Sequence, residues 1–238
     1  MQKAELIRSQ SDSELAHAVA RTWLDELAGT TSNRIHCVAL SGGRIAKTFF
    51  AAVVQHAKGR HIPFSNVHFF WADERCVPPL DAESNFRMAQ ELLLAPLDIA
   101  SQNVHRIRGE QSPADAARDA AVELCRVAPP AANGLPMFDV VFLGMGEDAH
   151  VASLFPGEQE SVMNLAQVYR PVVASKPPPN RITLGYGIIA AARHTWVLAS
   201  GKGKEQALRD SLAAGSVTPL GRVIRTRTHT RIYTDIQV

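Results

Sequence analysis

Hydrophobic residues recur at every fourth position near the start of the chain. Leu15, Val19, Trp23 and Leu27 form this series, and the polar segment 11–13 precedes them. Residues four apart lie on one face of an α-helix, and serine or aspartate often caps its first turn. The pattern therefore predicts a capped amphipathic helix that packs one side against the core.

Further along, the pattern changes to short, continuously apolar runs, each followed by glycine or polar residues and separated by stretches with helical spacing. The runs are IHCVAL (35–40), VHFFW (67–71), FDVVFL (138–143) and TWVLAS (195–200), and the helical stretches are IAKTFFAAVVQHAKG (45–59), NFRMAQELLL (85–94) and PADAARDAAVELCRV (113–127). Strands that are apolar on both faces and alternate with helices are typical of a parallel sheet. We predict an α/β fold with a doubly wound, mainly parallel, Rossmann-like sheet and helices on both faces.

Two irregular stretches interrupt these elements. PPAANGLP (129–136) is expected to be a surface connection, and SKPPPN (175–180) a stiff loop, because consecutive prolines prevent a helix. Neither is long enough to link independent domains, and we expect residues 1–238 to form one α/β domain.

Composition narrows the range of partners. The 238 residues are 46% hydrophobic, yet no stretch approaches the about 20 apolar residues that cross a bilayer, and the N-terminus carries charges where a signal peptide is apolar. A net charge of +2 does not favour nucleic acid. Cys37, Cys76 and Cys125 lack the spacing of a zinc or redox pair. We expect a cytoplasmic protein whose important basic residues surround a small anion.

Two polar clusters follow the first two apolar runs. At Ser41, Gly42 and Gly43, a glycine-rich turn before a helix allows either close approach to a phosphate or merely a tight turn. The segment WADERCVPPLDAESN (71–85) reads as a long polar loop, and the carboxylates beside Arg75 are expected to orient its guanidinium toward an anion. Simple solvation of that loop remains the alternative.

The third cluster is GMGEDAHVASLFPG (144–157). It places Asp148 two residues before His150, at the end of an apolar run. Histidine can act as a general base near neutral pH, and a carboxylate can fix its tautomer. A metal site is disfavoured because no second group of ligands has suitable spacing.

The fourth cluster is basic. Lys176 and Arg181 flank the prolines. Lys202 and Lys204 follow Gly201 at the start of a predicted helix, SGKGKEQAL (200–208). Cations at a helix N-terminus oppose the helix dipole, so a bound anion explains them better than helix stability does, although Lys202 fits simple solubility. No G-x-S-x-G serine motif is present, which favours attack by an activated water over an acyl-enzyme. Residue chemistry alone thus indicates a protein that handles a phosphorylated small molecule.

Taken in order, several motifs resemble the 6-phosphogluconolactonases, which share a larger family with glucosamine-6-phosphate deaminases. The matching segments are ALSGG (39–43), FFWADERCVP (69–78), ESNF (83–86), FDVVFLGMGEDAHVASLFPG (138–157), KPPPNRITL (176–184) and AARHTWVLASGKGKEQAL (191–208). SLFPG and WADERCVP are the most specific, and the deaminases usually differ after their own Asp-Gly-His segment.

The resemblance implies the deaminase/ribose-5-phosphate isomerase type of fold and hydrolysis of 6-phospho-D-glucono-1,5-lactone in the pentose phosphate pathway, without a cofactor. His150 is then the general base and Asp148 its orienting partner. Arg75, Arg181 and Lys204, with the backbone of 41–43, are expected to hold the phosphate. Asp73 and Asn85 match positions that line the site.

Two departures from the family pattern leave alternatives open. Arg44, Ile45 and Ala46 follow the double glycine where the family usually has Ser-Thr-Pro, so Arg44 either adds a cation or points outward. Ala149 stands where the family generally has glycine, and a left-handed backbone there would strain alanine and could displace His150. Because Asp148 and His150 are both retained, we expect an ordinary backbone conformation at Ala149. The rival readings are a non-catalytic sugar-phosphate-binding protein and a deaminase or isomerase.

Overall fold

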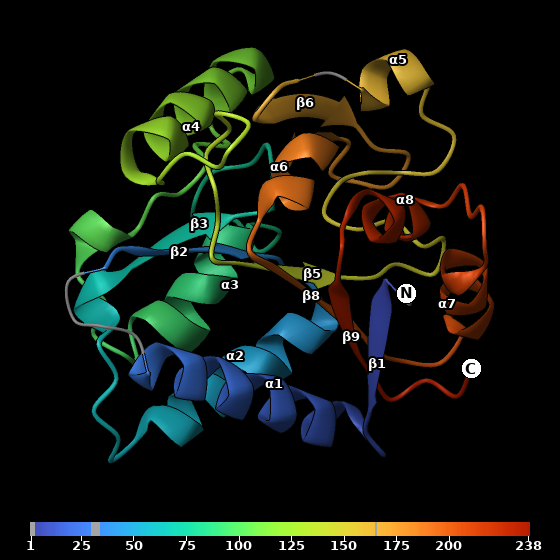
Figure 1. The fold of residues 1–238 in the computed structure, drawn as a ribbon. Helices are drawn as coiled ribbons and strands as arrows, with labels where there is room; N and C mark the ends of the chain where they lie inside the picture. The colour runs from blue at the N-terminus through green and yellow to red at the C-terminus, as the bar shows by residue number, and fades with distance from the viewer. Residues whose placement is uncertain (1–2, 30–33, 165) are drawn as a thin grey trace.

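A computed structural model describes residues 3–29, 34–164 and 166–238, and its centre is a six-stranded sheet (Figure 1). The strand order is β1-β9-β8-β5-β2-β3, and each neighbouring pair is parallel. The strands are β1 (Ala4–Arg8), β2 (His36–Leu40), β3 (Val67–Trp71), β5 (Val140–Gly144), β8 (His194–Ala199) and β9 (Thr230–Thr234). The predicted mainly parallel sheet is confirmed, and the four apolar runs supply β2, β3, β5 and β8.

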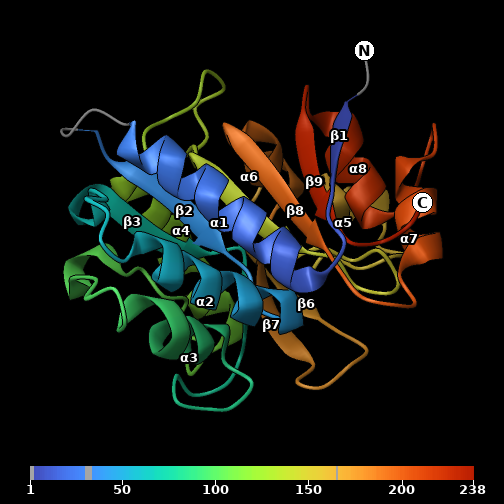
Figure 2. The same cartoon turned by 90° about the horizontal axis from the view of Figure 1, so that it is seen from below.

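Helices cover both faces of this sheet. Seen from below, α1 and α2 lie in front of the strands (Figure 2), whereas α4, α6 and α8 lie on the opposite side in Figure 1. The helices are α1 (Asp12–Ala28), α2 (Arg44–Ala57), α3 (Asn85–Ala89), α4 (Pro113–Val127), α5 (Glu160–Met163), α6 (Tyr186–Ala191), α7 (Glu205–Leu212) and α8 (Pro219–Thr226), with 3-10 turns at Phe64–Asn66 and Ser101–Asn103. A π-helical turn, Gln90–Leu94, continues α3. The doubly wound prediction is therefore confirmed.

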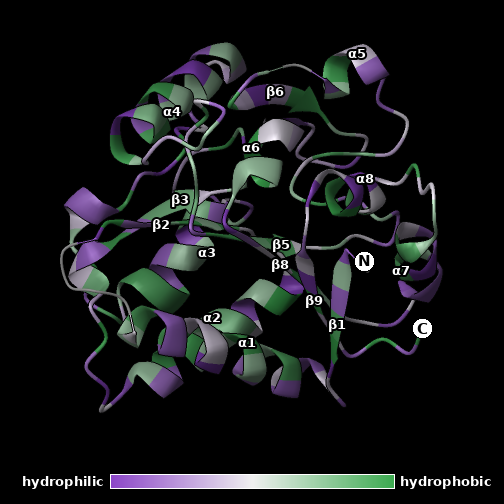
Figure 3. Cartoon of the chain, viewed as in Figure 1, coloured by the Kyte–Doolittle hydropathy of each residue, from purple (hydrophilic) through white to green (hydrophobic). Residues whose placement is uncertain are grey.

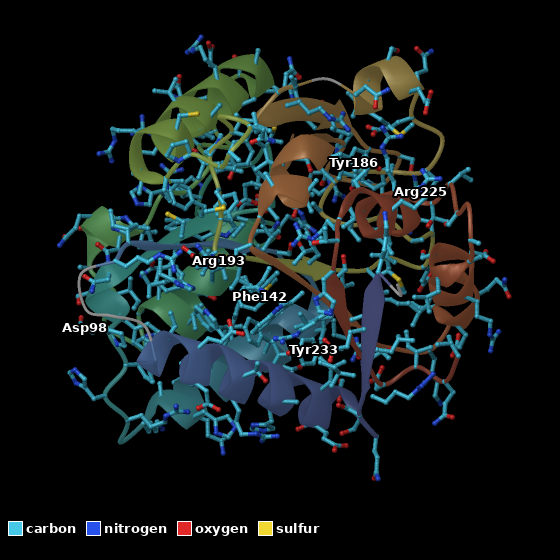
Figure 4. All side chains as sticks on the ribbon, viewed as in Figure 1. Asp98, Phe142, Tyr186, Arg193, Arg225 and Tyr233 are labelled. Carbon is cyan, nitrogen blue, oxygen red and sulfur yellow. The ribbon has the colours of Figure 1, made fainter. Side chains whose placement is uncertain are left out.

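The predicted capped helix is α1. Ser11 accepts a hydrogen bond from the Glu14 backbone N–H at 3.2 Å, and the apolar series of every fourth residue is buried. Alternating hydrophobic and hydrophilic bands along α1 and α4 mark these two-sided helices (Figure 3). Trp23 of α1 packs its ring 5.3 Å from that of Phe142 in β5, and Phe142 and Tyr233 both lie between the sheet and α1 (Figure 4).

A second, three-stranded antiparallel sheet lies beside the first. Its order is β4-β7-β6, with β4 (Asp73–Arg75), β7 (Asn180–Leu184) and β6 (Tyr169–Val173). The expectation of a loop beginning directly at Asp73 is wrong, because β4 pairs with β7 and places Arg75 opposite Arg181. The two segments are about a hundred residues apart in sequence, so local pattern alone gives no sign of the pairing.

The edge strand β1 and its neighbour β9 were also not predicted from the sequence. Their sequences, AELIR and TRIYT, mix charged and apolar residues, since β1 is an edge strand with partly exposed side chains. Within the described ranges, no helix combines the length and apolar character needed to span a membrane.

Candidate active site

A pocket opens where the carboxyl ends of β2, β5 and β8 meet the small sheet. Because these strands are parallel, the segments that follow them emerge at the same edge, as expected for an open α/β sheet. The pocket is lined by Ser41, Gly42, Gly43, Arg44, Ile45, Asp73, Arg75, Asn85, Gly144, Met145, Gly146, His150, Ala152, Arg181, Ser200 and Lys204. Every sequence-predicted site residue except Asp148 thus contributes to its wall, and Asp148 contacts the pocket through His150.

His150 is held by one ring nitrogen. Its Nδ1 lies 2.5 Å from Oδ1 of Asp148, which also accepts the His150 backbone N–H at 3.3 Å. Burial acts to raise the pKa of Asp148, but the hydrogen bonds and charge of His150 outweigh it and the net pKa is lowered. An ionised carboxylate accepts a hydrogen bond from Nδ1–H and keeps the proton on Nδ1, which leaves the Nε2 lone pair available. Among the described residues, Nε2 has no hydrogen-bond partner.

Close backbone packing surrounds this pair. The His150 carbonyl accepts the Gly146 N–H at 2.9 Å, and a Cβ at Gly146 would stand 2.0 Å from the His150 Nδ1. Only glycine therefore fits at this position without displacing the imidazole. A single methyl at Gly146 would break the contact between His150 and Asp148.

Ala149 has φ of 63°, in the left-handed region, so the expectation of an ordinary conformation is wrong. Its N–H donates to the Gly146 carbonyl at 3.2 Å, and its own carbonyl accepts the Leu220 N–H at 3.2 Å. These bonds define the turn that brings Asp148 and His150 together. His150 is not displaced, because the contacts of the turn outweigh the about 1 kcal/mol that alanine costs in this region.

Asp73 and Asn85 form another part of the pocket wall. Ser153 donates its hydroxyl to Asp73 Oδ2 at 2.7 Å, and Asn85 donates its Nδ2 to the Asp73 carbonyl at 2.9 Å. That bond orients the Asn85 amide so that Oδ1 faces Gly42, where a Cβ would approach to 1.9 Å. Asn85 Oδ1 is buried and has no partner in the part of the chain that the structure describes. It is an acceptor that a bound hydroxyl could satisfy.

Arg75 is oriented differently from the sequence expectation. Its Nη1 donates to the Glu83 carbonyl at 2.7 Å and lies 3.4 Å from the Glu83 carboxylate. The adjacent Glu74 carboxylate instead accepts backbone N–H groups, including that of Arg75 at 2.8 Å. The expectation that neighbouring carboxylates 73 and 74 hold the guanidinium is therefore wrong. Arg75 Nε is buried and unpaired within the described residues, so it can donate to a ligand.

Arg181 lies beside Arg75 in the antiparallel pairing. It donates Nε to the Pro178 carbonyl at 3.1 Å and Nη2 to the Lys176 carbonyl at 3.4 Å. Burial lowers the pKa of Arg181, and the positive charge of Arg75 lowers it further. Two guanidinium groups on one wall repel each other until an anion lies between them. The loop 175–180 thus supplies two backbone carbonyls that fix the orientation of the Arg181 guanidinium.

Lys204 and Arg44 also line the pocket. Lys204 donates its Nζ to the Met145 carbonyl at 2.5 Å, and its pKa is lowered by burial and then by Arg44. Arg44 donates to Asp12 Oδ2 at 2.7 Å and also lines the pocket. It therefore adds a cation to the pocket, while its Nη1 points outward to Asp12.

The glycine-rich turn contributes mainly its backbone. Ser41 donates its hydroxyl to the Phe142 carbonyl at 2.8 Å, which ties β2 to β5. Gly43 precedes α2 without a side-chain cap, so the first N–H groups of this helix are free to bind an anion. Nowhere in residues 3–29, 34–164 and 166–238 do three or more His, Cys, Asp or Glu side chains form a group suited to a metal ion.

Sequence reasoning missed several contributors. Ser200 and Met145 directly follow strands, and this position was the available signal for them. Glu83 and Ser153 act from outside the pocket on Arg75 and Asp73, and nothing in the sequence points to these contacts.

The chain is similar to known proteins of one family. The family model for glucosamine-6-phosphate isomerases/6-phosphogluconolactonase matches residues 10–233. The chain belongs to this family. It is 38% identical over 173 residues to the 6-phosphogluconolactonase of Treponema pallidum, covering 72% of this chain and 70% of the relative. It is 34% identical over 197 residues to that of Haemophilus influenzae, covering 82% and 81%.

Solved structures of family members share the fold. The 6-phosphogluconolactonase of Trypanosoma brucei superposes with a TM-score of 0.83 at 28% identity, over 98% of this chain and 96% of that one. A monomeric glucosamine-6-phosphate deaminase gives 0.81 at 16% identity, over 97% and 96%, and this likeness concerns the fold alone. The family resemblance inferred from the sequence motifs is confirmed.

Proposed function

We propose that the protein hydrolyses 6-phospho-D-glucono-1,5-lactone to 6-phosphogluconate, without a cofactor. One observation carries the proposal: a histidine with a carboxylate on Nδ1 and a free Nε2 shares its pocket with four cationic side chains. A base and an anion-binding cluster in one pocket suit a phosphorylated substrate with a hydrolysable bond. The names of the relatives support the choice of lactone, and the proposed setting is the cytoplasm.

In this proposal the phosphate lies among the cations. Arg75, Arg181 and Lys204 bind its oxygens, together with the backbone N–H groups of residues 41–43 and of the α2 N-terminus. Arg44 adds positive charge at the rim. Binding the phosphate orients the distant lactone carbonyl over His150, and this proximity supplies much of the acceleration.

The proposed reaction uses His150 twice. Its Nε2 accepts a proton from water as the water oxygen attacks the lactone carbonyl carbon, and Asp148 stabilises the resulting imidazolium. Backbone N–H groups or a cation of the pocket stabilise the tetrahedral oxyanion. The bond to the ring oxygen then breaks, and the imidazolium returns the proton to that oxygen. Water is thus added across one C–O bond, and His150 is regenerated.

In this scheme Asn85 binds the sugar and Asp73 orients Asn85. Asn85 Oδ1 accepts a hydrogen from a substrate hydroxyl, since this buried acceptor has no partner in the described chain. Asp73, whose Oδ2 is occupied by Ser153, acts mainly by orienting the Asn85 amide through its backbone carbonyl. The pocket therefore favours a hydroxylated, phosphorylated substrate over phosphate itself.

The decisive experiment measures acid release from freshly generated 6-phosphogluconolactone, with and without purified protein. We expect opening far faster than in buffer, and much weaker acceleration of unphosphorylated gluconolactone. Binding of 6-phosphogluconate without acceleration would indicate a non-catalytic sugar-phosphate-binding protein. Release of ammonia from glucosamine-6-phosphate would instead indicate the deaminase activity that also occurs in the family.

A further inference from the structure

Glu74 is a buried carboxylate immediately behind the pocket wall. It lies in β4 with 2% of its surface exposed, and it does not line the pocket. Burial raises the pKa of Glu74 to about 7. Burying a carboxylate is unfavourable unless its oxygens are well bonded, so its presence here requires a specific reason.

Both oxygens of Glu74 are occupied by donors from the chain. Oε1 accepts the backbone N–H groups of Arg75 and Asn85, each at 2.8 Å. Oε2 accepts the Phe86 N–H at 2.7 Å and the Ser84 hydroxyl at 3.2 Å. One carboxylate therefore joins β4 to the N-terminus of α3, across the intervening loop.

Two of the residues whose backbone N–H groups bind this carboxylate, Arg75 and Asn85, carry unpaired atoms of the pocket wall. Arg75 Nε is a buried donor and Asn85 Oδ1 a buried acceptor, and neither has a partner among the described residues. Unpaired buried groups are costly in a protein that has no use for them. Both side chains line the pocket, so a ligand is the available partner for each.

We propose that Glu74 is a positioning residue, whose carboxylate holds the backbone of Arg75 and Asn85 so that their side chains present one donor and one acceptor to the substrate. The identity of that substrate rests on the proposed function. Glu74 itself contacts no ligand. The surrounding ionisable groups are Asp73, Cys76 and Arg106, and Arg106 is paired with Glu110.

A carboxylate suits this task better than an amide does. Glutamine at position 74 has one acceptor oxygen, and its Nε2 would face at least one backbone N–H donor. Glu74→Gln therefore loosens the junction without changing its size. His150 and Asp148 lie on another loop, so the proton transfer itself is unaffected.

The test measures binding and turnover on the full-length variant. We expect Glu74→Gln to weaken 6-phosphogluconate binding about tenfold, as for one lost charged hydrogen bond, and to raise KM for the lactone similarly. We expect kcat to change less than about threefold. Inorganic phosphate, which offers no sugar hydroxyl to Asn85, should lose less affinity. If Glu74 only stabilised the fold, Glu74→Gln would lower Tm and leave Kd and KM unchanged, and that result would overturn the proposal.

Two comparisons sharpen the test. Glu91→Gln makes the same substitution at an exposed residue that pairs with Arg87, and binding should not change. In an Asn85→Ala background, Glu74→Gln should weaken binding less than about threefold, because its effect passes partly through Asn85. If Glu74→Gln weakened binding by the same factor with and without Asn85→Ala, that result would contradict the proposal.

If Glu74→Gln does not fold, Glu74→Asp provides the measurement. Aspartate keeps the charge but withdraws the oxygens by one methylene, so weaker sugar-phosphate binding with near-normal kcat is again expected, and unchanged binding would refute the role. A wild-type protein that binds 6-phosphogluconate without lactone turnover removes the proposed hydrolysis only. A wild-type protein that binds neither 6-phosphogluconate nor inorganic phosphate overturns both proposals.

Discussion

Two histidine–carboxylate pairs in this protein have similar geometry and different surroundings. His150 Nδ1 lies 2.5 Å from Asp148, and His105 Nδ1 lies 2.7 Å from Glu123 on α4. The His105 side chain is 5% exposed and stacks 4.5 Å from the Phe70 ring, whereas the His150 side chain is 26% exposed and borders the cationic pocket.

The second ring nitrogen distinguishes the pairs. His105 Nε2 lies 2.8 Å from His68 Nδ1, so the lone pair left by the Glu123 contact already accepts a hydrogen. His150 Nε2 has no such partner in the described chain. A carboxylate on one nitrogen prepares a histidine as a base only when the other nitrogen faces a substrate site. The following predictions test this contrast.

The largest effect is expected at His150. His150→Ala should lower kcat by about 10² to 10⁴, the usual contribution of a general base, while 6-phosphogluconate affinity stays within about threefold. Steady-state kinetics and calorimetry measure the two quantities. His105→Ala is the matched change and should leave kcat of the folded protein near normal. Comparable losses in both variants would remove the distinction.

Asp148 should have the next largest effect. Asp148→Asn permits the wrong tautomer of His150, so kcat should fall at least about tenfold with little change in substrate binding. Kinetics with phosphorylated lactone provide the measurement. Glu123→Gln, the corresponding change in the other pair, should alter stability and not kcat, and full activity of Asp148→Asn would show that Asp148 does not orient the base.

The buried pair of His105 and Glu123 should instead control the stability of the fold at mildly acidic pH. Burial lowers the pKa of His105, although its hydrogen bond to the Glu123 carboxylate opposes this, so the unfolded chain binds the extra proton first. Stability from this group is therefore present above about pH 6.5 and is lost as pH falls below it. His105→Gln should reduce that loss, because glutamine binds no proton in either state. Urea unfolding at about pH 5, 6 and 7 measures it.

Glu123 allows the two pH ranges to be separated. The hydrogen bond from Arg126, with a further one from His105, lowers the pKa of Glu123 to about 2. Its contribution is present above about pH 4.5 and is lost only as pH falls toward 2. Wild type and His105→Gln with parallel stability profiles between about pH 5 and 6.5 would therefore contradict the role of His105.

The smallest effect is expected at Ala149. Ala149→Gly relieves about 1 kcal/mol of left-handed strain, but it also removes a buried methyl and increases the freedom of the unfolded chain, so the free energy of unfolding should change by less than about 1 kcal/mol. The kcat should stay within about twofold, because the His150–Asp148 contact already exists. A large gain in kcat would show that alanine displaces the base.

Much of the fold could be predicted because its signals are local. The apolar runs became β2, β3, β5 and β8, and the helical spacing became α1, α2 and α4. The strands β1 and β9 were missed because their short sequences, AELIR and TRIYT, mix charged and apolar residues and form no continuous apolar run. The strand β4 was missed because its antiparallel partner β7 lies far along the chain.

The site was predictable to the extent that parallel strands end at one edge. Ser41, His150 and Lys204 all follow such strands, so the sequence alone predicts that they meet in one pocket. The orientation of Arg75 by Glu83, and the use of Glu74 as a backbone acceptor, depend on how a loop returns to β4. Residue spacing contains no information about that return.

The sequence by itself determined the parallel α/β architecture, the family and the residues available for chemistry, because periodicity and motifs are properties of neighbouring positions. Only the tertiary structure decided which atoms are free to act. Asp148 occupies one nitrogen of His150 and leaves the other open, whereas Glu123 and His68 occupy both nitrogens of His105. Reactivity here depends on which ring nitrogen stays unpaired, and for His105 this is settled by contacts with His68 and Glu123, which lie 37 and 18 residues away in the chain.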